Sequence, residues 1–400
     1  MSSRTATRGR RSDRRWAGLA SLATAGALAL VVPAAAAATP RTAPRATWAL
    51  VATPGHGTSP VGFASDACVG PTFCMAVGGV GGTGASHPFT ARFDGTAWSA
   101  LPAAKHEPAD AELSGISCVS ATWCVAVGHS TKALIEQWNG TAWTVAKSVS
   151  PDTGGNVLAD VTCLSKSWCR AVGDAFDSGG ESRTLIEAWN GRAWSLVRSP
   201  DDTALSNWLD GISCTTTAFC QAVGFFATDG GDGKVVQQTL AERWDGRHWT
   251  LSPTKDRIAM TNDLYSVSCA TTKYCIAVGR DETLQHNIAA DVSEAQLWNG
   301  STWSLVSTPL ADSSVRTLSD VTCPAPRSCT IVGNRTQPGA KDTSVITVRG
   351  AAWSAQSSPN RATSKDNQLA AVSCPTSSRC EAVGYDLVGH TEQTLAERGP

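Results

Sequence analysis

The chain has 400 residues, a formal net charge of −1, and 15 tryptophans against eight phenylalanines and three tyrosines. A chain of this length usually divides into two or three domains, unless a short unit repeats. A near-neutral chain whose only basic run lies in its first residues is not typical of nucleic-acid-binding proteins. The excess of tryptophan indicates instead a residue with a fixed place in a repeated unit.

The first 38 residues have the features of an export signal. Six arginines precede the apolar stretch WAGLASLATAGALALVV, and PAAAAATP then offers small-residue cleavage sites. An uncleaved transmembrane anchor is the alternative, since the stretch is almost long enough to span a bilayer. Its alanine content, its proline and the repeated A-x-A sites favour cleavage. We therefore expect a signal peptide over 1–38, a Thr/Pro linker over 39–45, and a secreted, extracellular protein without membrane contact after cleavage.

The 14 cysteines form seven pairs, each with five residues between the partners. The pairs are Cys68 with Cys74, Cys118 with Cys124, Cys163 with Cys169, Cys214 with Cys220, Cys269 with Cys275, Cys323 with Cys329, and Cys374 with Cys380. Successive pairs begin 45 to 55 residues apart, a period typical of propellers. Each pair is predicted to form a disulfide across a tight strand connection. Zinc binding is disfavoured because neither the spacing nor any histidine pattern fits it.

Each unit reads as four strands. In the second unit LSGISC leads through a short turn to CVAVG, and after a variable loop ALIEQWNG and TAWTVAKS follow. Alternating apolar residues bounded by glycine and asparagine predict strands. The Asn-Gly or Asp-Gly between the last two strands of most units predicts a tight hairpin.

The fourth strand opens with a tryptophan in six units, whereas the seventh unit lacks it. A matching segment, ATWALVATP, lies near the start of the predicted mature chain and places Trp48 as Trp303 stands in STWSLVSTP. We predict that this strand completes the last unit and leaves no free sheet edge. The predicted fold is all-β: a single seven-bladed β-propeller over residues 46–400, with four-stranded blades and one disulfide per blade.

This plan resembles the seven-bladed β-propellers over about residues 46–399. The WD40, kelch and Asp-box propellers share the blade plan, but neither a GH…WD signature nor an S-x-D-x-G-x-x-W box is present here. The whole repeat looks most like that of uncharacterised propellers secreted by actinobacteria. The resemblance implies architecture and localisation, not an activity.

The predicted strand order separates two faces of the ring. With the N-terminal strand outermost, the segment that ends at the first cysteine is innermost and lines the central channel. The cysteine hairpins and the Asn-Gly hairpins then share one face and are short and nearly constant. The other connections, such as GDAFDSGGESR and GFFATDGGDGKV, are long and irregular. We therefore expect the opposite face to carry any specificity.

The fourth unit departs most from the repeat. It alone has an aromatic residue, Trp208, six positions before its first cysteine, and Phe225 and Phe226 follow its AVG motif. Aromatic rings beside carboxylates suit sugar binding. The predicted ligand-binding residues are Trp208, Asp210, Phe225, Phe226, Asp229 and Asp232. The alternative is that the aromatic rings merely pack the loops onto the blade.

Four aspartates lie within four residues of the first cysteine of their units: Asp66, Asp160, Asp210 and Asp320. Two of them could form the acid/base pair of a glycoside hydrolase or a polysaccharide lyase. The column of Asp160 and Asp320 also holds Gly, Ser and Ala in other units, which weakens that hypothesis. Glutamates recur at 136, 187, 242 and 397, which favours a hydrogen-bonding or solvated role on an outer strand over catalysis. No metal spacing and no cofactor motif is present, so no cofactor is predicted.

These features predict a secreted, monomeric binding module that recognises an extracellular polysaccharide or a cell-surface protein on its long-loop face. Neither nucleic acid nor, after signal cleavage, a membrane is expected as a partner. One alternative is the hydrolase or lyase that uses the channel aspartates, although the sequence favours a protein that is not an enzyme. A passive protein-interaction platform is the further alternative.

Overall fold

The computed structural model describes residues 47–400 except 56, 58, 82–84, 150, 152–154, 202–204, 232–233, 258–259, 286–287, 310–314, 338 and 390. They belong to the unit formed by residues 46–400, which is separate from residues 1–45. The predicted signal peptide and linker therefore lie outside the described residues. Within the described ranges no helix is long and apolar enough to cross a membrane.

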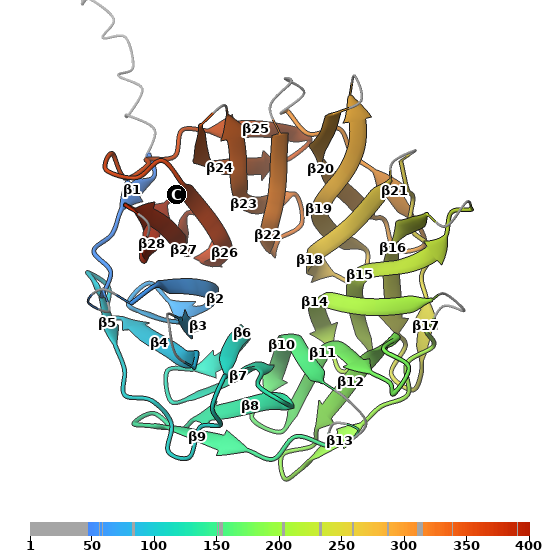
Figure 1. Cartoon of the computed structure of the whole chain (residues 1–400), viewed down its shortest axis with the longest axis horizontal. Helices are drawn as coiled ribbons and strands as arrows, with labels where there is room; N and C mark the ends of the chain where they lie inside the picture. The colour runs from blue at the N-terminus through green and yellow to red at the C-terminus, as the bar shows by residue number, and fades with distance from the viewer. Residues whose placement is uncertain are drawn as a thin grey trace, which may run out of the picture. The chain divides into compact units, whose positions relative to one another are not determined.

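The described residues form seven four-stranded antiparallel sheets arranged as the blades of a ring (Figure 1). Blade 1 contains β2 (Val61–Gly70), β3 (Phe73–Val80), β4 (His87–Phe93) and β5 (Trp98–Ala100), and blade 2 contains β6 (Glu112–Ser120), β7 (Trp123–His129), β8 (Ala133–Trp138) and β9 (Trp143–Ala146). Blade 3 contains β10 (Asn156–Ser165), β11 (Trp168–Phe176), β12 (Ser182–Trp189) and β13 (Trp194–Leu196), and blade 4 contains β14 (Ser206–Thr216), β15 (Phe219–Asp229), β16 (Val235–Trp244) and β17 (Trp249–Leu251). Blade 5 contains β18 (Thr261–Thr271), β19 (Tyr274–Gln285), β20 (Ile288–Trp298) and β21 (Trp303–Leu305), and blade 6 contains β22 (Val315–Ala325), β23 (Ser328–Gln337), β24 (Ala340–Arg349) and β25 (Ala352–Gln356). Blade 7 contains β26 (Asn367–Thr376), β27 (Arg379–Val388) and β28 (Thr391–Gly399), together with β1 (Ala49–Leu50).

The ring closes through the two ends of the propeller unit. Strand β1 is the outermost strand of blade 7 and pairs with β28, with Ala49 opposite Arg398 and Leu50 opposite Glu397. Trp48 is 5 % exposed and belongs to the apolar cluster between blades 6 and 7. The predicted fold class, including the borrowed fourth strand of the last blade, is confirmed.

A bulge in every inner strand explains the glycine of the AVG motif. In blade 4, Leu209 pairs with Gly224 and Gly211 pairs with Val223, so Asp210 is left outside the ladder. A Cβ on Gly224 would lie 2.1 Å from the carbonyl oxygen of Trp208. The equivalent glycine of the other six blades would meet the same carbonyl at 1.9–2.1 Å. Only glycine allows the second strand to pass this close to the bulge.

The seven predicted disulfides are all present, one per blade. The partners lie on the first two strands of each blade, with Cα atoms 3.9–4.1 Å apart. Each bond closes a short loop, for which the chain-entropy model gives about 2 to 2.5 kcal/mol. In blades 2 to 5 a tryptophan pair lies beside the disulfide, with ring centroids 5.6–5.7 Å apart.

Hydrogen bonds from a backbone N–H to a serine side chain join the inner strands of neighbouring blades at four of the junctions. In four blades the residue before the first cysteine is a serine, which accepts a hydrogen bond from the backbone N–H of the first cysteine in the following blade. The other three blades have Ala67, Thr162 and Thr322 at this position. The N–H of Cys163 donates to Ser117 at 3.0 Å, that of Cys269 to Ser213 at 2.9 Å, and that of Cys323 to Ser268 at 2.9 Å. Ser373 of blade 7 accepts from Cys68 of blade 1 at 2.9 Å. The same contact that links neighbouring blades therefore also closes the ring.

The recurring glutamates form a second link between blades. Glu187, Glu242 and Glu397 are 0 % exposed. They accept hydrogen bonds at 2.6–2.7 Å from Ser148, Ser199 and Ser358, which belong to the connection leaving the preceding blade. The hydrogen-bonding role expected for this column is present in these three, whereas both carboxylate oxygens of the equally buried Glu136 have no hydrogen-bond partner among the described residues. Solvation, the other expectation, is wrong because the incoming connection covers the carboxylates.

A substitution of Trp48 tests directly how much the closure of the ring contributes to stability. We expect Trp48→Ala to lower the free energy of unfolding by about 3 to 5 kcal/mol, because it empties a buried tryptophan site at the seam. Leu50→Ala, two residues further along the chain, is the control, since Leu50 is 43 % exposed. Its loss should stay below about 1 kcal/mol. Equal losses for the two variants in chemical denaturation would contradict this account of closure.

Candidate functional site

The ends of the inner strands carry side chains that differ from blade to blade. At each end, the residue six positions before the first cysteine pairs with the residue after the AVG motif. We call these the rim pairs. They are Gly62–Gly79, Glu112–His129, Val157–Asp174, Trp208–Phe225, Asp263–Arg280, Thr317–Asn334 and Gln368–Tyr385. They lie on the long-loop face, so this face has the variable chemistry that the strand order predicts.

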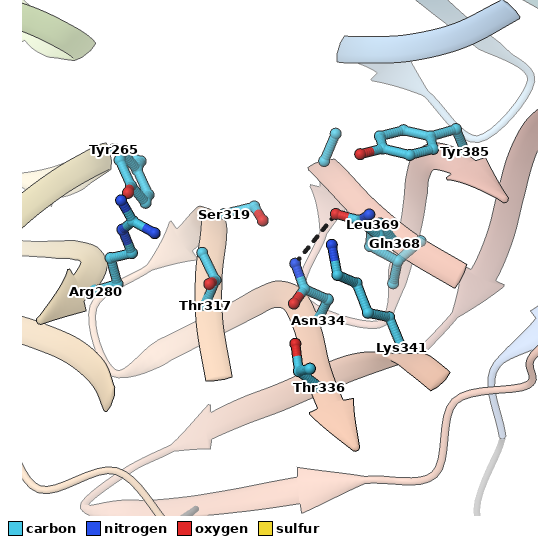
Figure 2. Close-up of a pocket in the computed structure, with 11 residues that line it drawn as sticks. Tyr265, Arg280, Thr317, Ser319, Asn334, Thr336, Lys341, Gln368, Leu369 and Tyr385 are labelled. Carbon is cyan, nitrogen blue, oxygen red and sulfur yellow. Dashed lines mark hydrogen bonds between the residues drawn. The ribbon is translucent and has the colours of Figure 1, made fainter. Parts of the chain in front are cut away.

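A cavity of about 390 Å³ opens on this rim across blades 5, 6 and 7 (Figure 2). It is lined by Tyr265 and Arg280 from blade 5, by Thr317, Ser319, Asn334, Thr336 and Lys341 from blade 6, and by Gln368, Leu369, Ala370 and Tyr385 from blade 7. Its volume is within the range of ligand pockets. The lining includes two cationic side chains and no carboxylate.

Asp263 organises the blade 5 wall of the cavity. Its side chain is buried, accepts a hydrogen bond from the Tyr265 hydroxyl at 3.2 Å, and lies 3.4 Å from Nε of Arg280. Burial, and then the neighbouring charge of Asp263, raise the pKa of Tyr265 above its ordinary value. The phenol therefore stays protonated, and one carboxylate fixes the direction of both side chains.

The facing wall combines amides, a cation and a second phenol. Asn334 Nδ2 donates to Gln368 Oε1 at 3.4 Å, and Figure 2 shows Lys341 beside this pair with Tyr385 above it. Lys341 is half-buried and makes no ion pair with any residue that the structure describes. Burial raises the pKa of Tyr385, with a further contribution from Glu392. This wall therefore offers hydrogen-bond donors and one cation without a partner.

The cavity continues into the central channel, with which it shares Tyr265, Ser319 and Ala370. Asp160, Asp210 and Asp320 line a pocket of about 100 Å³ in the channel. Asp66 does not line it. It occupies a position that is Ile or Val in the other units, and its Oδ1 has no hydrogen-bond partner among the described residues. The structure thus brings three of the four candidate acids together.

Two of the channel aspartates hold neighbouring blades together. Asp160 accepts hydrogen bonds from the backbone N–H of Val161 at 2.7 Å and of Ile212, in the next blade, at 2.9 Å. Asp320 accepts from Val321 at 2.8 Å and from Val372, in blade 7, at 2.7 Å. Both carboxylates therefore have a structural role at blade junctions.

Burial changes the protonation of the channel aspartates. It raises the pKa of Asp320 to about 6 and that of Asp160 to about 7, although hydrogen bonds to both carboxylates oppose the shift. Burial, and then the charges of Asp174 and Asp263, raise the pKa of Asp210 to about 8. Asp210 Oδ2 has no hydrogen-bond partner among the described residues. Of the three, Asp210 has the least compensation for its burial.

The predicted ligand-binding residues do not gather at one place. Trp208 and Phe225 form a rim pair with stacked rings, 4.6 Å between centroids and 22° between planes. Phe226 packs against the core of blade 4, and exposed Asp229 accepts a hydrogen bond from Gly231 within its own loop. Asp232 lies outside the described residues. Asp210 faces the channel, so the aromatic pair is the part of the set that remains on the rim.

Sequence reasoning missed most of the cavity. Tyr265, Arg280, Lys341 and Tyr385 are ordinary residue types in three different units, and no local motif connects them. Their position in the repeat could have identified two of them, because Arg280 and Tyr385 occupy the same column as Phe225, directly after the AVG motif. Among the residues in view, no group of three or more His, Cys, Asp or Glu side chains could hold a metal ion.

Comparison with known proteins supports the architecture. No family model and no curated protein matches the sequence. The chain is similar to the solved structure "YCF48 bound to D1 peptide", with a TM-score of 0.55 and 12 % identity over 91 % of this chain and 99 % of that chain. It is also similar to "YCF48 from Cyanidioschyzon merolae", with a TM-score of 0.51 and 13 % identity over 88 % of this chain and 99 % of that chain. These likenesses show the fold alone.

Asp210 gives a prediction about pH. Its folded pKa of about 8 lies above the ordinary value of 3.8, so the folded state retains a proton that the unfolded chain releases. Stability is therefore lost as pH rises from about 4 through 8. Asp210→Ser, which copies Ser114 and Ser319 in the same column, should raise the stability by on the order of 1 to 3 kcal/mol at pH 8. It should have little effect at pH 4.5.

Thermal unfolding at the two pH values checks this expectation. Asp229→Ser is the matched control, because Asp229 is exposed. It should change the stability equally at both pH values. A stabilisation by Asp210→Ser that is the same at pH 4.5 and pH 8 would show that the buried charge is not its cause.

Proposed function

We propose that this protein is an exported binding propeller that captures a peptide segment of a protein partner in the cavity across blades 5 to 7. The observation that carries the proposal is the composition of this cavity on the variable rim. Two neutral phenols, two amides, three hydroxyls and two cations line it. Such side chains suit the carbonyl and amide groups of an extended peptide, and the aromatic rings supply apolar contact area.

Two further observations support the proposal. A propeller with a similar fold has been solved as "YCF48 bound to D1 peptide", which supports a peptide as a ligand for this architecture. The seven disulfides favour an oxidising compartment, and hence export. A cell-surface protein, one of the two partner classes expected from the sequence, is the partner we favour.

Two of the three aspartates that line the channel pocket favour binding over hydrolysis. Asp160 and Asp320 each accept backbone hydrogen bonds from two blades. A general acid or base must exchange its proton with substrate, and these carboxylates already serve as acceptors at blade junctions. We therefore propose no catalytic step. Polysaccharide binding would depend instead on the stacked Trp208–Phe225 pair.

The test uses random decapeptides displayed on phage and selected on the oxidised protein. We expect selected peptides to lose about tenfold or more in affinity for Tyr385→Ala, because an aromatic anchor at a pocket wall is a typical binding hot spot. Tyr274→Ala is the matched control. Tyr274 is also half-buried, but lies beside Cys275 on the cysteine-hairpin face. Its loss should leave affinity unchanged.

Two results would overturn the proposed peptide site. One is a loss of affinity with Tyr274→Ala but not with Tyr385→Ala, and the other is equal binding by the wild type and Tyr385→Ala. The same protein is incubated with insoluble polysaccharides and assayed for retention and for released sugar. Retention that Trp208→Ala abolishes would support the carbohydrate alternative. Sugar release that Asp160→Asn abolishes would support the hydrolase alternative. Thermal unfolding of each variant confirms that it is folded.

A further inference from the structure

We infer that the cavity across blades 5 to 7 anchors a carboxylate group of its peptide on Lys341. The group is either the free C-terminus of the partner or an Asp or Glu side chain. This inference rests on the proposed function and names the chemistry that the cavity selects.

The charges around the cavity leave one cation without compensation. Arg280 has Asp263 at 3.4 Å behind it, so the charge of this pair is largely balanced. Lys341 has no ion pair with the residues described, although its backbone N–H donates to the carbonyl of Lys365. Asp366 and Glu392 act on Tyr385, and neither forms an ion pair with Lys341. A ligand with one negative charge would supply the missing partner.

Neutral donors surround this cation. Gln368 Oε1 accepts the hydrogen bond from Asn334, and the Gln368 side chain also hydrogen-bonds the Tyr385 phenol. Because the NH₂ group has two N–H bonds, one of them remains to donate toward a ligand. Thr336 lines the cavity beside Asn334 (Figure 2), and its hydroxyl is a further donor. A carboxylate accepts several hydrogen bonds at once, and a bond from an ammonium group is among the strongest.

The donor set distinguishes a carboxylate from a phosphate. Recognition of a dianionic phosphate typically uses clustered arginines that donate in pairs. Here the single arginine of the lining is already engaged by Asp263 on the opposite wall. One ammonium group with neutral amide and hydroxyl donors matches a monoanion in charge. The geometry therefore points to a carboxylate.

The experiment uses peptides selected on the wild-type protein and synthesised in three forms. The first is the free acid, the second has an amidated C-terminus, and the third has each Asp or Glu replaced by Asn or Gln. We expect one neutral form to bind about tenfold or more weakly, as for the loss of a charge-assisted hydrogen bond. Sensitivity to amidation identifies the C-terminus as the source, and sensitivity to the side-chain replacement identifies an acidic residue.

The variant Lys341→Gln tests whether the charge of Lys341 is the partner of the peptide's carboxylate. Its affinity for the free acid should fall to that of the sensitive neutral form, and the difference between the two forms should disappear. Lys365→Gln removes the same charge from an exposed neighbour that does not line the cavity, and should preserve the difference. Raising the salt concentration should weaken the free acid more than the neutral form.

The outcomes separate this inference from the proposed function. Peptides that depend on Tyr385 but bind Lys341→Gln and wild type equally, in acid and neutral forms alike, would overturn the carboxylate anchor and leave the peptide site intact. An absence of peptides that depend on Tyr385 would instead overturn the proposed function itself. Thermal unfolding confirms that Lys341→Gln and Lys365→Gln are folded.

Discussion

The contact between each blade and the next is the constraint on which the rest of the structure depends. A single four-stranded blade cannot bury its apolar faces, so each face needs a neighbour, and the first blade must meet the last. Hydrogen bonds from a cysteine N–H to a serine join the inner strands at three junctions, and the bond from Cys68 to Ser373 does the same across the closure. Pairing of β1 with β28 completes the last sheet. A ring built in this way leaves no blade face unpaired.

This constraint assigns most repeated residues to architecture. The AVG glycine accommodates the bulge, the cysteines close the inner hairpin, and the buried glutamates hold the connection from the preceding blade. The channel aspartates Asp160 and Asp320, which occur in two blades of one column, belong to the same group because they accept backbone hydrogen bonds from the next blade. Residues that do not repeat are then the ones available for function. They are concentrated in the rim pairs of the long-loop face.

The sequence predicted the fold because its evidence was repeated in every unit. A cysteine period near 50 residues and a displaced tryptophan strand together specified the number of blades and their closure. The site was harder to predict, because Trp208 stands out by its type whereas Tyr265, Lys341 and Tyr385 do not. Their proximity depends on the curvature of the ring, and the direction of Tyr265 depends on its hydrogen bond to Asp263. The burial of Glu242 was missed for a similar reason, since a connection from another blade covers it.

Hydrogen exchange, measured on the oxidised protein with and without a peptide selected on it, tests most directly whether the long-loop face binds. We expect slower exchange of backbone amides in residues 317–319, 334–337, 339–341, 368–370 and 385. We expect no change in the cysteine hairpins or the Asn-Gly hairpins of the opposite face, such as residues 139–142. Protection confined to those hairpins would contradict the division of the ring into a scaffold face and a binding face.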